Sequence, residues 1–327
     1  MIAADASTRW RSDADLSTAI VTAIARRTNT RAVILCGSRA TGGAQPDSDY
    51  DVLAVMPLLA VPLRLAHLDA AARELESELG VPVSINPLPS FRLRRPGRTL
   101  LVWKALTEGV VLAGDAFTGG TEVPLLTAQA ARSYALSGLR YLLAHVDPDM
   151  PPSGWGSARV AADVRKALLH AAQLQLLTRG RYASTIADAA RQLDATEALE
   201  LERLAARADD LSTWRRVAEL LQPWVGRHEE QPRSRLPDLQ YLALSAISRR
   251  RPHPAVLIAD RSVRVRLATA VELLVRSVGA DGGVDGGHVE AANAILPRHL
   301  RSSDPSFTSV RDAVEREWAL ADPLVGL

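Results

Sequence analysis

Two acidic residues and a small-residue turn lie close together near the start of the chain. Gly37 and Ser38 follow the apolar run 32–36, and Asp49 and Asp51 come a short stretch later. Because alternate side chains of a strand point to the same face, we expect the two carboxylates to lie together. Carboxylates suit Mg²⁺, a hard ion that also takes phosphate oxygens and water. Backbone N–H groups at a Gly-Ser turn can bind phosphate, and Ser38 adds a hydroxyl donor. The segment therefore predicts a phosphate cradle beside a cation site.

The neighbouring residues predict the elements that hold this site. Apolar, partly β-branched runs and alternating patterns indicate strands, whereas longer runs with helical spacing indicate helices. On these grounds we expect strands over 32–36, 48–55, 81–87 and 108–114, and helices over 61–79 and 98–108.

The spacing of Gly37, Ser38, Asp49 and Asp51 resembles the signature of the nucleotidyltransferase superfamily related to DNA polymerase β. The resemblance is closest to its small-molecule and minimal members, and it covers about the first third of the chain. It implies that Asp49 and Asp51 hold Mg²⁺ and that a nucleoside triphosphate, by default ATP, binds at the turn. The reaction implied is transfer of a nucleoside monophosphate to an acceptor, with release of pyrophosphate.

Four further residues bear on this interpretation, two in the same segment and two on a neighbouring strand. Arg39 and Ser48 are expected to assist nucleotide binding, Arg39 by contacting phosphate. Members of the family usually carry a third carboxylate on a neighbouring strand, and the residue that aligns with it here is Ser84. Neither Ser84 nor Asn86 can accept a proton near neutral pH. Three interpretations stay open: a base from another part of the chain, an acceptor that needs no deprotonation, or a domain that binds nucleotide without turnover.

Length and composition predict a two-domain α+β protein. The chain has 327 residues, 47% of them hydrophobic. A composition shift separates residues 1–124 from a remainder with helical spacing. The family resemblance implies that residues 1–124 form an α/β nucleotidyltransferase domain with a short mixed sheet. An all-α domain that binds the acceptor and closes the site would occupy 125–327, with a sub-boundary near 227–237.

Net charge, cysteine content and hydropathy bear on the cellular location of the protein and on its partners. The net charge of +2 gives no general attraction to nucleic acid, and the chain has a single cysteine, Cys36. No run of eighteen apolar residues occurs, and residues 1–15 are polar rather than a basic and apolar leader. These features predict a cytoplasmic protein without a membrane partner.

One helical segment of the second part carries candidate functional residues. Asp163, Lys166 and His170 follow the apolar face of the stretch 156–177, which resembles the helix that closes the cleft in small-molecule nucleotidyltransferases. Asp163 is then a candidate catalytic base and Lys166 a candidate triphosphate ligand. An exposed salt-bridged helix flank explains the same spacing without a function.

Two other classes of protein remain alternatives. Arg165 and His170 fit the loose Arg-x4-His pattern of HEPN-type ribonucleases. A regulatory or antitoxin-like module that binds nucleotide or a partner protein would fit the absent third carboxylate.

Overall fold

The computed structural model of the chain describes two compact units. The described residues are 13–42, 48–57, 60–90, 93, 100–114, 123, 126, 128–146, 157–226 and 263–321. The first unit comprises those within Met1–Pro124, and the second those within Leu125–Leu242 and Pro252–Val325. A small mixed sheet with helices forms the first unit and helices form the second, so the fold is α+β as predicted. The expected sub-boundary near 227–237 lies outside the described residues.

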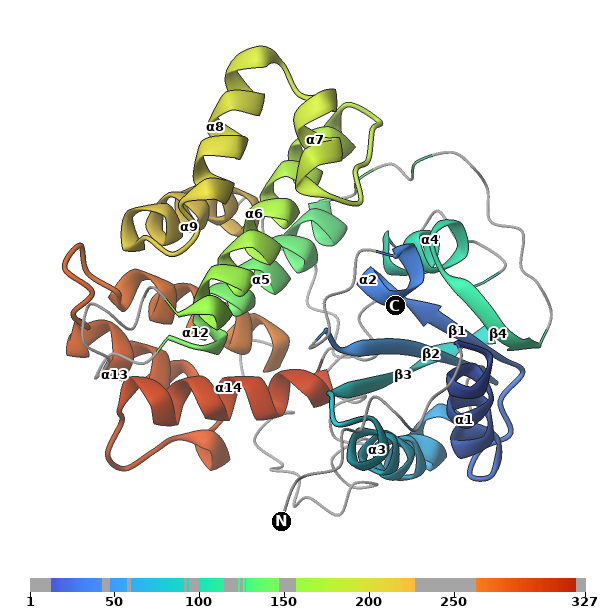
Figure 1. Cartoon of the computed structure of the whole chain (residues 1–327). Coiled ribbons are helices and arrows are strands. Elements are labelled where there is room, and N and C mark those ends of the chain that lie inside the picture. The colour runs from blue at the N-terminus through green and yellow to red at the C-terminus, as the bar shows by residue number, and fades with distance from the viewer. Residues whose placement is uncertain are drawn as a thin grey trace, which may run out of the picture. The chain divides into compact units, whose positions relative to one another are not determined.

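A four-stranded mixed sheet organises the first unit (Figure 1). Its strands are β1 (Ala32–Cys36), β2 (Tyr50–Met56), β3 (Val83–Pro89) and β4 (Val110–Gly114). They lie in the order β3-β2-β1-β4; β1 runs antiparallel to β2 and β4, and β2 runs parallel to β3.

Helices cover both faces of this sheet (Figure 1). The helices are α1 (Asp13–Ala25), α2 (Gly37–Thr41), α3 (Ala60–Leu79) and α4 (Leu100–Thr107). On one face, α1 and α3 pack against each other and the sheet, while α4 packs against the other face. Val102 and Ala105 of α4 bury Ile34 of β1 and Leu53 of β2 there. This apolar contact fixes α4 beside the end of the sheet that carries the candidate acids.

Strand boundaries differ slightly from the prediction. The second strand begins at Tyr50 rather than residue 48. The Tyr50 N–H donates to the carbonyl of Pro82, just before β3, at 2.9 Å, and this is the first hydrogen bond between the two segments. The third strand extends to Pro89 rather than 87. It lies at the edge of the sheet, where proline is tolerated because one side of the strand needs no N–H donors.

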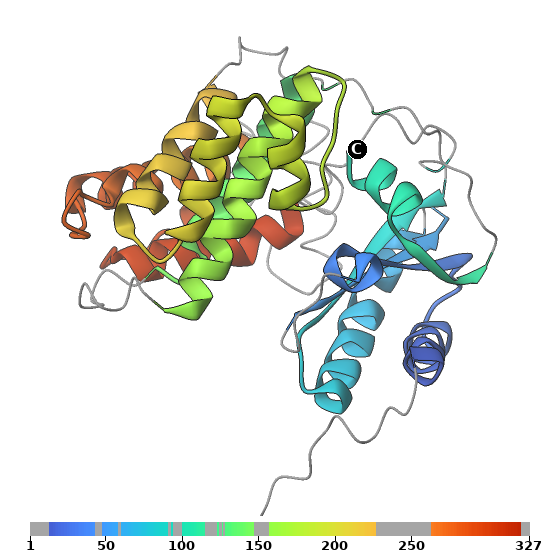
Figure 2. The same cartoon turned by 45° about the horizontal axis from the view of Figure 1, so that its top comes forward.

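The second unit is a helical bundle. It contains α5 (Ala128–Ala144), α6 (Ala158–Thr178), α7 (Ile186–Gln192), α8 (Ala195–Ala206), α9 (Leu211–Gly226), α12 (Val263–Ser277), α13 (Gly286–Ile295), η5 (Arg298–Leu300) and α14 (Phe307–Ala321). Helices α5, α6 and α9 lie alongside one another (Figure 2), and α12 packs on α5, α13 and α14. Their apolar faces share one core, which includes Leu139, Leu168 and Trp214. Within the described parts of the chain, no helix combines the length and apolar character needed to cross a bilayer.

Candidate functional site

The Asp51 carboxylate lies directly against the turn that follows the first strand. Cys36, the last residue of β1, pairs with Asp51 of β2, and Gly37 follows with φ of 71°. A Cβ atom at Gly37 would lie 2.7 Å from Asp51 Oδ2, closer than side chains approach. Glycine is therefore favoured at position 37 for two reasons. It adopts the left-handed backbone conformation without strain, and it has no Cβ to collide with the Asp51 carboxylate.

The turn itself is a single helical turn between two left-handed glycines. Helix α2 begins at Gly37 without a side-chain hydrogen bond to cap it, and Gly42, with φ of 75°, ends it. Ser38 is half-buried in its first turn. Uncapped N–H groups beside a serine hydroxyl are suited to phosphate oxygens.

Asp49 lies just before β2, outside the strand. Its side chain and that of Asp51 are half-buried, whereas Tyr50 between them is 8% exposed and Val52 is buried. Exposure therefore alternates along this segment, as a period-two arrangement of the acids would require.

Arg39 links α2 to the residues at the start of β2. Its Nε and Nη2 donate to the Ser48 carbonyl at 3.0 and 2.6 Å. The centre of its guanidinium lies 4.0 Å from the centroid of the Tyr50 ring. The phosphate contact expected of Arg39 stays a prediction. In the structure, its guanidinium contacts the Ser48 carbonyl and the Tyr50 ring.

Ser84 lies beside Asp51 on the next strand. In the parallel pair of β2 and β3, Asp51 is the partner of Ser84. Asn86 Nδ2 donates to Ser84 Oγ at 2.9 Å, so both polar side chains lie on one face of β3. A hydroxyl therefore stands where a third carboxylate would meet the first two.

Lys104 of α4 is a charged neighbour that the sequence reasoning missed. Its ammonium interacts electrostatically with Glu108, Asp51 and Cys36. Burial lowers the pKa of Lys104, while Glu108 and Asp51 act in the opposite direction. The available signal was its rarity, since the chain has only one other lysine.

Cys36 completes this cluster but offers no reactive thiolate. Burial, followed by the charge of Asp51, raises the pKa of the Cys36 thiol to about 12. A thiol with so high a pKa is protonated near neutral pH and is a poor nucleophile. We therefore assign Cys36 to the packing beneath the site.

The donor set fits a magnesium ion that arrives with a polyphosphate. No group of three or more His, Cys, Asp and Glu side chains is gathered for a metal among the residues that the structure describes. Two carboxylates are nevertheless enough ligands for the protein to supply, because Mg²⁺ commonly takes its other ligands from substrate phosphates and water.

The comparison with protein families agrees with this geometry. Residues 19–102 match the family model described as nucleotidyltransferase domain. This segment is a nucleotidyltransferase domain. It includes the Gly37 turn, both candidate metal ligands and Ser84, and it ends inside α4, just before Lys104. No curated protein showed significant similarity to the chain.

In the helical unit, Asp163 pairs with a histidine that the sequence analysis did not select. Asp163 of α6 is buried, and its Oδ2 contacts Nδ1 of His145, which directly follows α5. The His145 side chain is 46% exposed. Lys166 is exposed, with its Nζ 5.3 Å from the centroid of the Tyr141 ring. Asp163 and Lys166 of the expected stripe therefore contact different neighbours, His145 just after α5 and Tyr141 within α5.

The two residues of the ribonuclease-like pattern contact different helices. The His170 ring stacks on the Tyr134 ring of α5, with centroids 4.1 Å apart and an interplanar angle of 7°. Arg165 Nε instead donates to the carbonyl of Ala205 in α8. The structure thus does not bring Arg165 and His170 together at one site.

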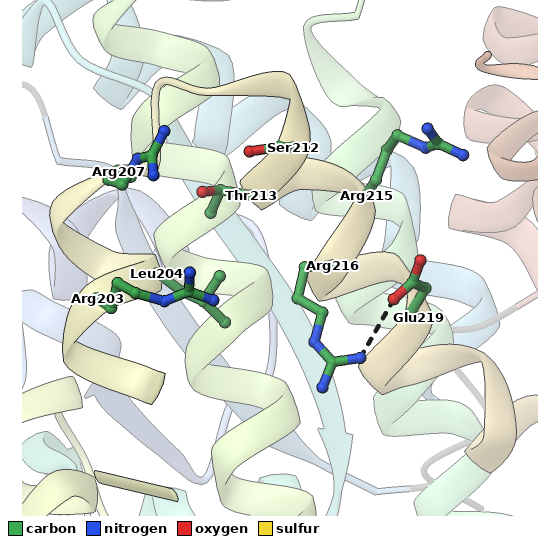
Figure 3. Close-up of a pocket in the computed structure, with 8 residues that line it drawn as sticks. All are labelled: Arg203, Leu204, Arg207, Ser212, Thr213, Arg215, Arg216 and Glu219. Atoms are coloured by element: carbon green, nitrogen blue, oxygen red, sulfur yellow. Dashed lines mark hydrogen bonds and ion pairs between the residues drawn. The ribbon is translucent and has the colours of Figure 1, made fainter. Parts of the chain in front are cut away.

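A pocket of about 380 Å³ lies elsewhere in the helical unit, between the end of α8 and the start of α9 (Figure 3). Arginines are prominent in its lining, but Arg207 pairs with Asp210 at 2.7 Å and Arg216 with Glu200 at 2.9 Å. Arg215 points away from the other arginines in this view. The pocket contains none of the predicted site residues, and we assign it no role.

Proposed function

We propose that the protein is a Mg²⁺-dependent nucleotidyltransferase that moves a nucleoside monophosphate, AMP from ATP by default, to an acceptor and releases pyrophosphate. The observation that carries the proposal is the position of the Asp51 carboxylate against the Gly37 turn, inside a nucleotidyltransferase domain. A carboxylate and uncapped N–H groups at one point are suited to a cation and the phosphates that it accompanies.

Each candidate site residue of the first unit has a role in this reaction. Asp49 and Asp51 would hold the Mg²⁺ ion, which when bound polarises the transferred phosphate and neutralises the leaving pyrophosphate. The turn that begins at Gly37 would present backbone N–H groups to the phosphates, and Ser38 would donate its hydroxyl to them. Ser48 contributes its carbonyl to the arginine contact that closes the loop.

Where the acceptor has to lose a proton, the base comes from outside the strand next to Asp51, because Ser84 cannot accept a proton near neutral pH. We place it in the helical unit, proposed here as the acceptor-binding domain. There the buried Asp163 orients the exposed His145 through Nδ1, which leaves Nε2 to take a proton from an acceptor hydroxyl. Lys166, exposed on the same helix as Asp163, is the candidate ligand of the triphosphate.

A second function is favoured by one observation, the hydroxyl of Ser84 at the register position next to Asp51. A site with two carboxylates can bind a nucleotide and its cation without turning it over. The alternative is therefore a regulatory module that binds nucleotide or a partner protein.

Calorimetric titration tests the shared premise of both functions. Mg²⁺ with a non-hydrolysable ATP analogue is titrated into the wild type and into the Asp49→Asn, Asp51→Asn double variant. We expect metal-dependent binding in the wild type and at least a tenfold (about 1.4 kcal/mol) loss in the variant. Asp69→Asn, an exposed acid on α3, is the matched control.

The outcomes separate the interpretations. Binding lost only in the double variant supports the site and justifies an acceptor screen by pyrophosphate release. Absence of binding to ATP, GTP, CTP and UTP analogues in the wild type would overturn the enzyme proposal.

A further inference from the structure

Asp49 is the candidate metal ligand that the sheet does not hold. β2 starts at Tyr50, whose N–H is bonded to Pro82, whereas Asp51 is fixed by strand pairing on both sides. Asp49 precedes this ladder, so the contacts of its two neighbours in the chain bear on its position.

Arg39 contacts the residues on either side of Asp49. It donates two hydrogen bonds to the carbonyl of Ser48, which precedes Asp49, and its guanidinium lies over the ring of Tyr50, which follows. Tyr50 is itself buried, so the ring is a fixed support. One planar cation thus holds the backbone before Asp49 and the side chain after it.

We propose that Arg39 is the positioning residue of Asp49 and thereby sets the cation affinity of the site. The inference rests on the proposed function, because it takes Asp49 to be a metal ligand. It assigns Arg39 a contact with its own chain in place of the contact with phosphate that the sequence suggested.

Arginine is suited to this task in a way that lysine is not. The guanidinium offers several N–H donors in a rigid plane, so two of them can reach one carbonyl while the flat face packs on an aromatic ring. An ammonium group is a point charge without that plane. Arg39→Lys therefore keeps the charge near the phosphates but loses the double hydrogen bond and the stacking.

The experiment compares four variants of the full chain: Arg39→Lys, Tyr50→Leu, Tyr50→Phe and, as a control, Arg73→Lys on the exposed face of α3. Mn²⁺ affinity is measured by electron paramagnetic resonance with a non-hydrolysable ATP analogue present, and nucleotide affinity is measured separately in EDTA. We expect Arg39→Lys and Tyr50→Leu to weaken Mn²⁺ binding about 10- to 100-fold, as loss of a residue that orients a metal ligand does. Tyr50→Phe keeps the ring and should bind as the wild type does. Nucleotide affinity in EDTA should be unchanged in all four.

Several results would overturn the proposal. Wild-type Mn²⁺ affinity in both Arg39→Lys and Tyr50→Leu would do so. A loss of nucleotide affinity in EDTA for Arg39→Lys, with Tyr50→Leu unaffected, would assign Arg39 to phosphate instead.

A ligand-free measurement separates this inference from the proposed function. Hydrogen exchange in the peptide that contains residues 48–51 should be faster in Arg39→Lys than in the wild type and Arg73→Lys. If the wild type binds no Mn²⁺, the proposed function fails and so does the link to cation affinity. Faster exchange in Arg39→Lys would then still establish the positioning role, and unchanged exchange would remove it.

Discussion

At the scale of single residues, Gly37 couples the proposed phosphate turn to Asp51, a proposed metal ligand. Its φ of 71° disfavours any side chain, and a Cβ there would meet Asp51 Oδ2 at 2.7 Å. We predict that Gly37→Ala destabilises the fold by roughly 1–2 kcal/mol through backbone strain. It should also displace the Asp51 carboxylate and so weaken metal-dependent nucleotide binding. Denaturant unfolding and calorimetry measure the two effects.

Gly42→Ala is a matched control for this prediction. Gly42 has nearly the same backbone angle, φ of 75°, but a Cβ there would meet no atom within 4 Å. The control should therefore show the strain without the loss of binding. Equal binding in the two variants would contradict the role given to the contact between Gly37 and Asp51.

Residue types and spacing were enough to predict part of this site. Gly37, Ser38 and Asp51 lie close in sequence, and a strand, a turn and the next strand bring such residues together by local geometry. The charge of Lys104 acts on Asp51 because α4 packs across the sheet. His145 reaches Asp163 only because α5 and α6 lie side by side. Contacts between elements that are distant along the chain produce no periodic pattern of residues from which they could be predicted.

At the scale of elements, the register of β2 and β3 decides which residue stands next to Asp51. That residue is Ser84, and because the two residues are direct partners in the register, its side chain lies on the same face of the sheet as the Asp51 carboxylate. We predict that Ser84→Asp adds a third carboxylate and strengthens Mn²⁺ binding in the absence of nucleotide by about tenfold, equal to 1.4 kcal/mol. Titration followed by electron paramagnetic resonance measures the change.

Ser84→Asn supplies a polar side chain of similar size without the charge, and its affinity for Mn²⁺ should stay at the wild-type level. The added charge should also lower stability slightly in metal-free buffer, because two carboxylates then face each other. Unchanged Mn²⁺ affinity in Ser84→Asp would show that residue 84 does not face the cation.

The order of elements followed from the sequence better than their ends did. Apolar runs fixed the strands and helical spacing fixed α3 and α4, because burial on a sheet or helix face imposes those periods. The start of β2 depends on a single hydrogen bond to Pro82 and the length of β3 on its edge position. Neither is visible in the residues of one strand alone.

At the scale of the whole molecule, we propose that each unit supplies residues to the reaction. The nucleotidyltransferase domain offers two candidate metal ligands and a candidate phosphate turn, but Ser84 stands next to Asp51, where the family resemblance implies a third carboxylate. The helical unit holds a buried acid bonded to an exposed imidazole, Asp163 and His145. If these two residues act together on an acceptor hydroxyl, their loss should affect transfer without affecting nucleotide binding to the other unit.

We predict that His145→Asn and Asp163→Asn each slow pyrophosphate release with a hydroxyl acceptor about 10²- to 10⁴-fold, the usual contribution of a general base. Calorimetric nucleotide affinity should stay at the wild-type level, and His288→Asn, which alters an exposed histidine paired with Asp285 in the same unit, serves as control. A lower melting temperature with unchanged transfer would make the pair a structural tie between α5 and α6. In that case the acceptor is expected to be a phosphate or carboxylate, since such a group attacks without first losing a proton.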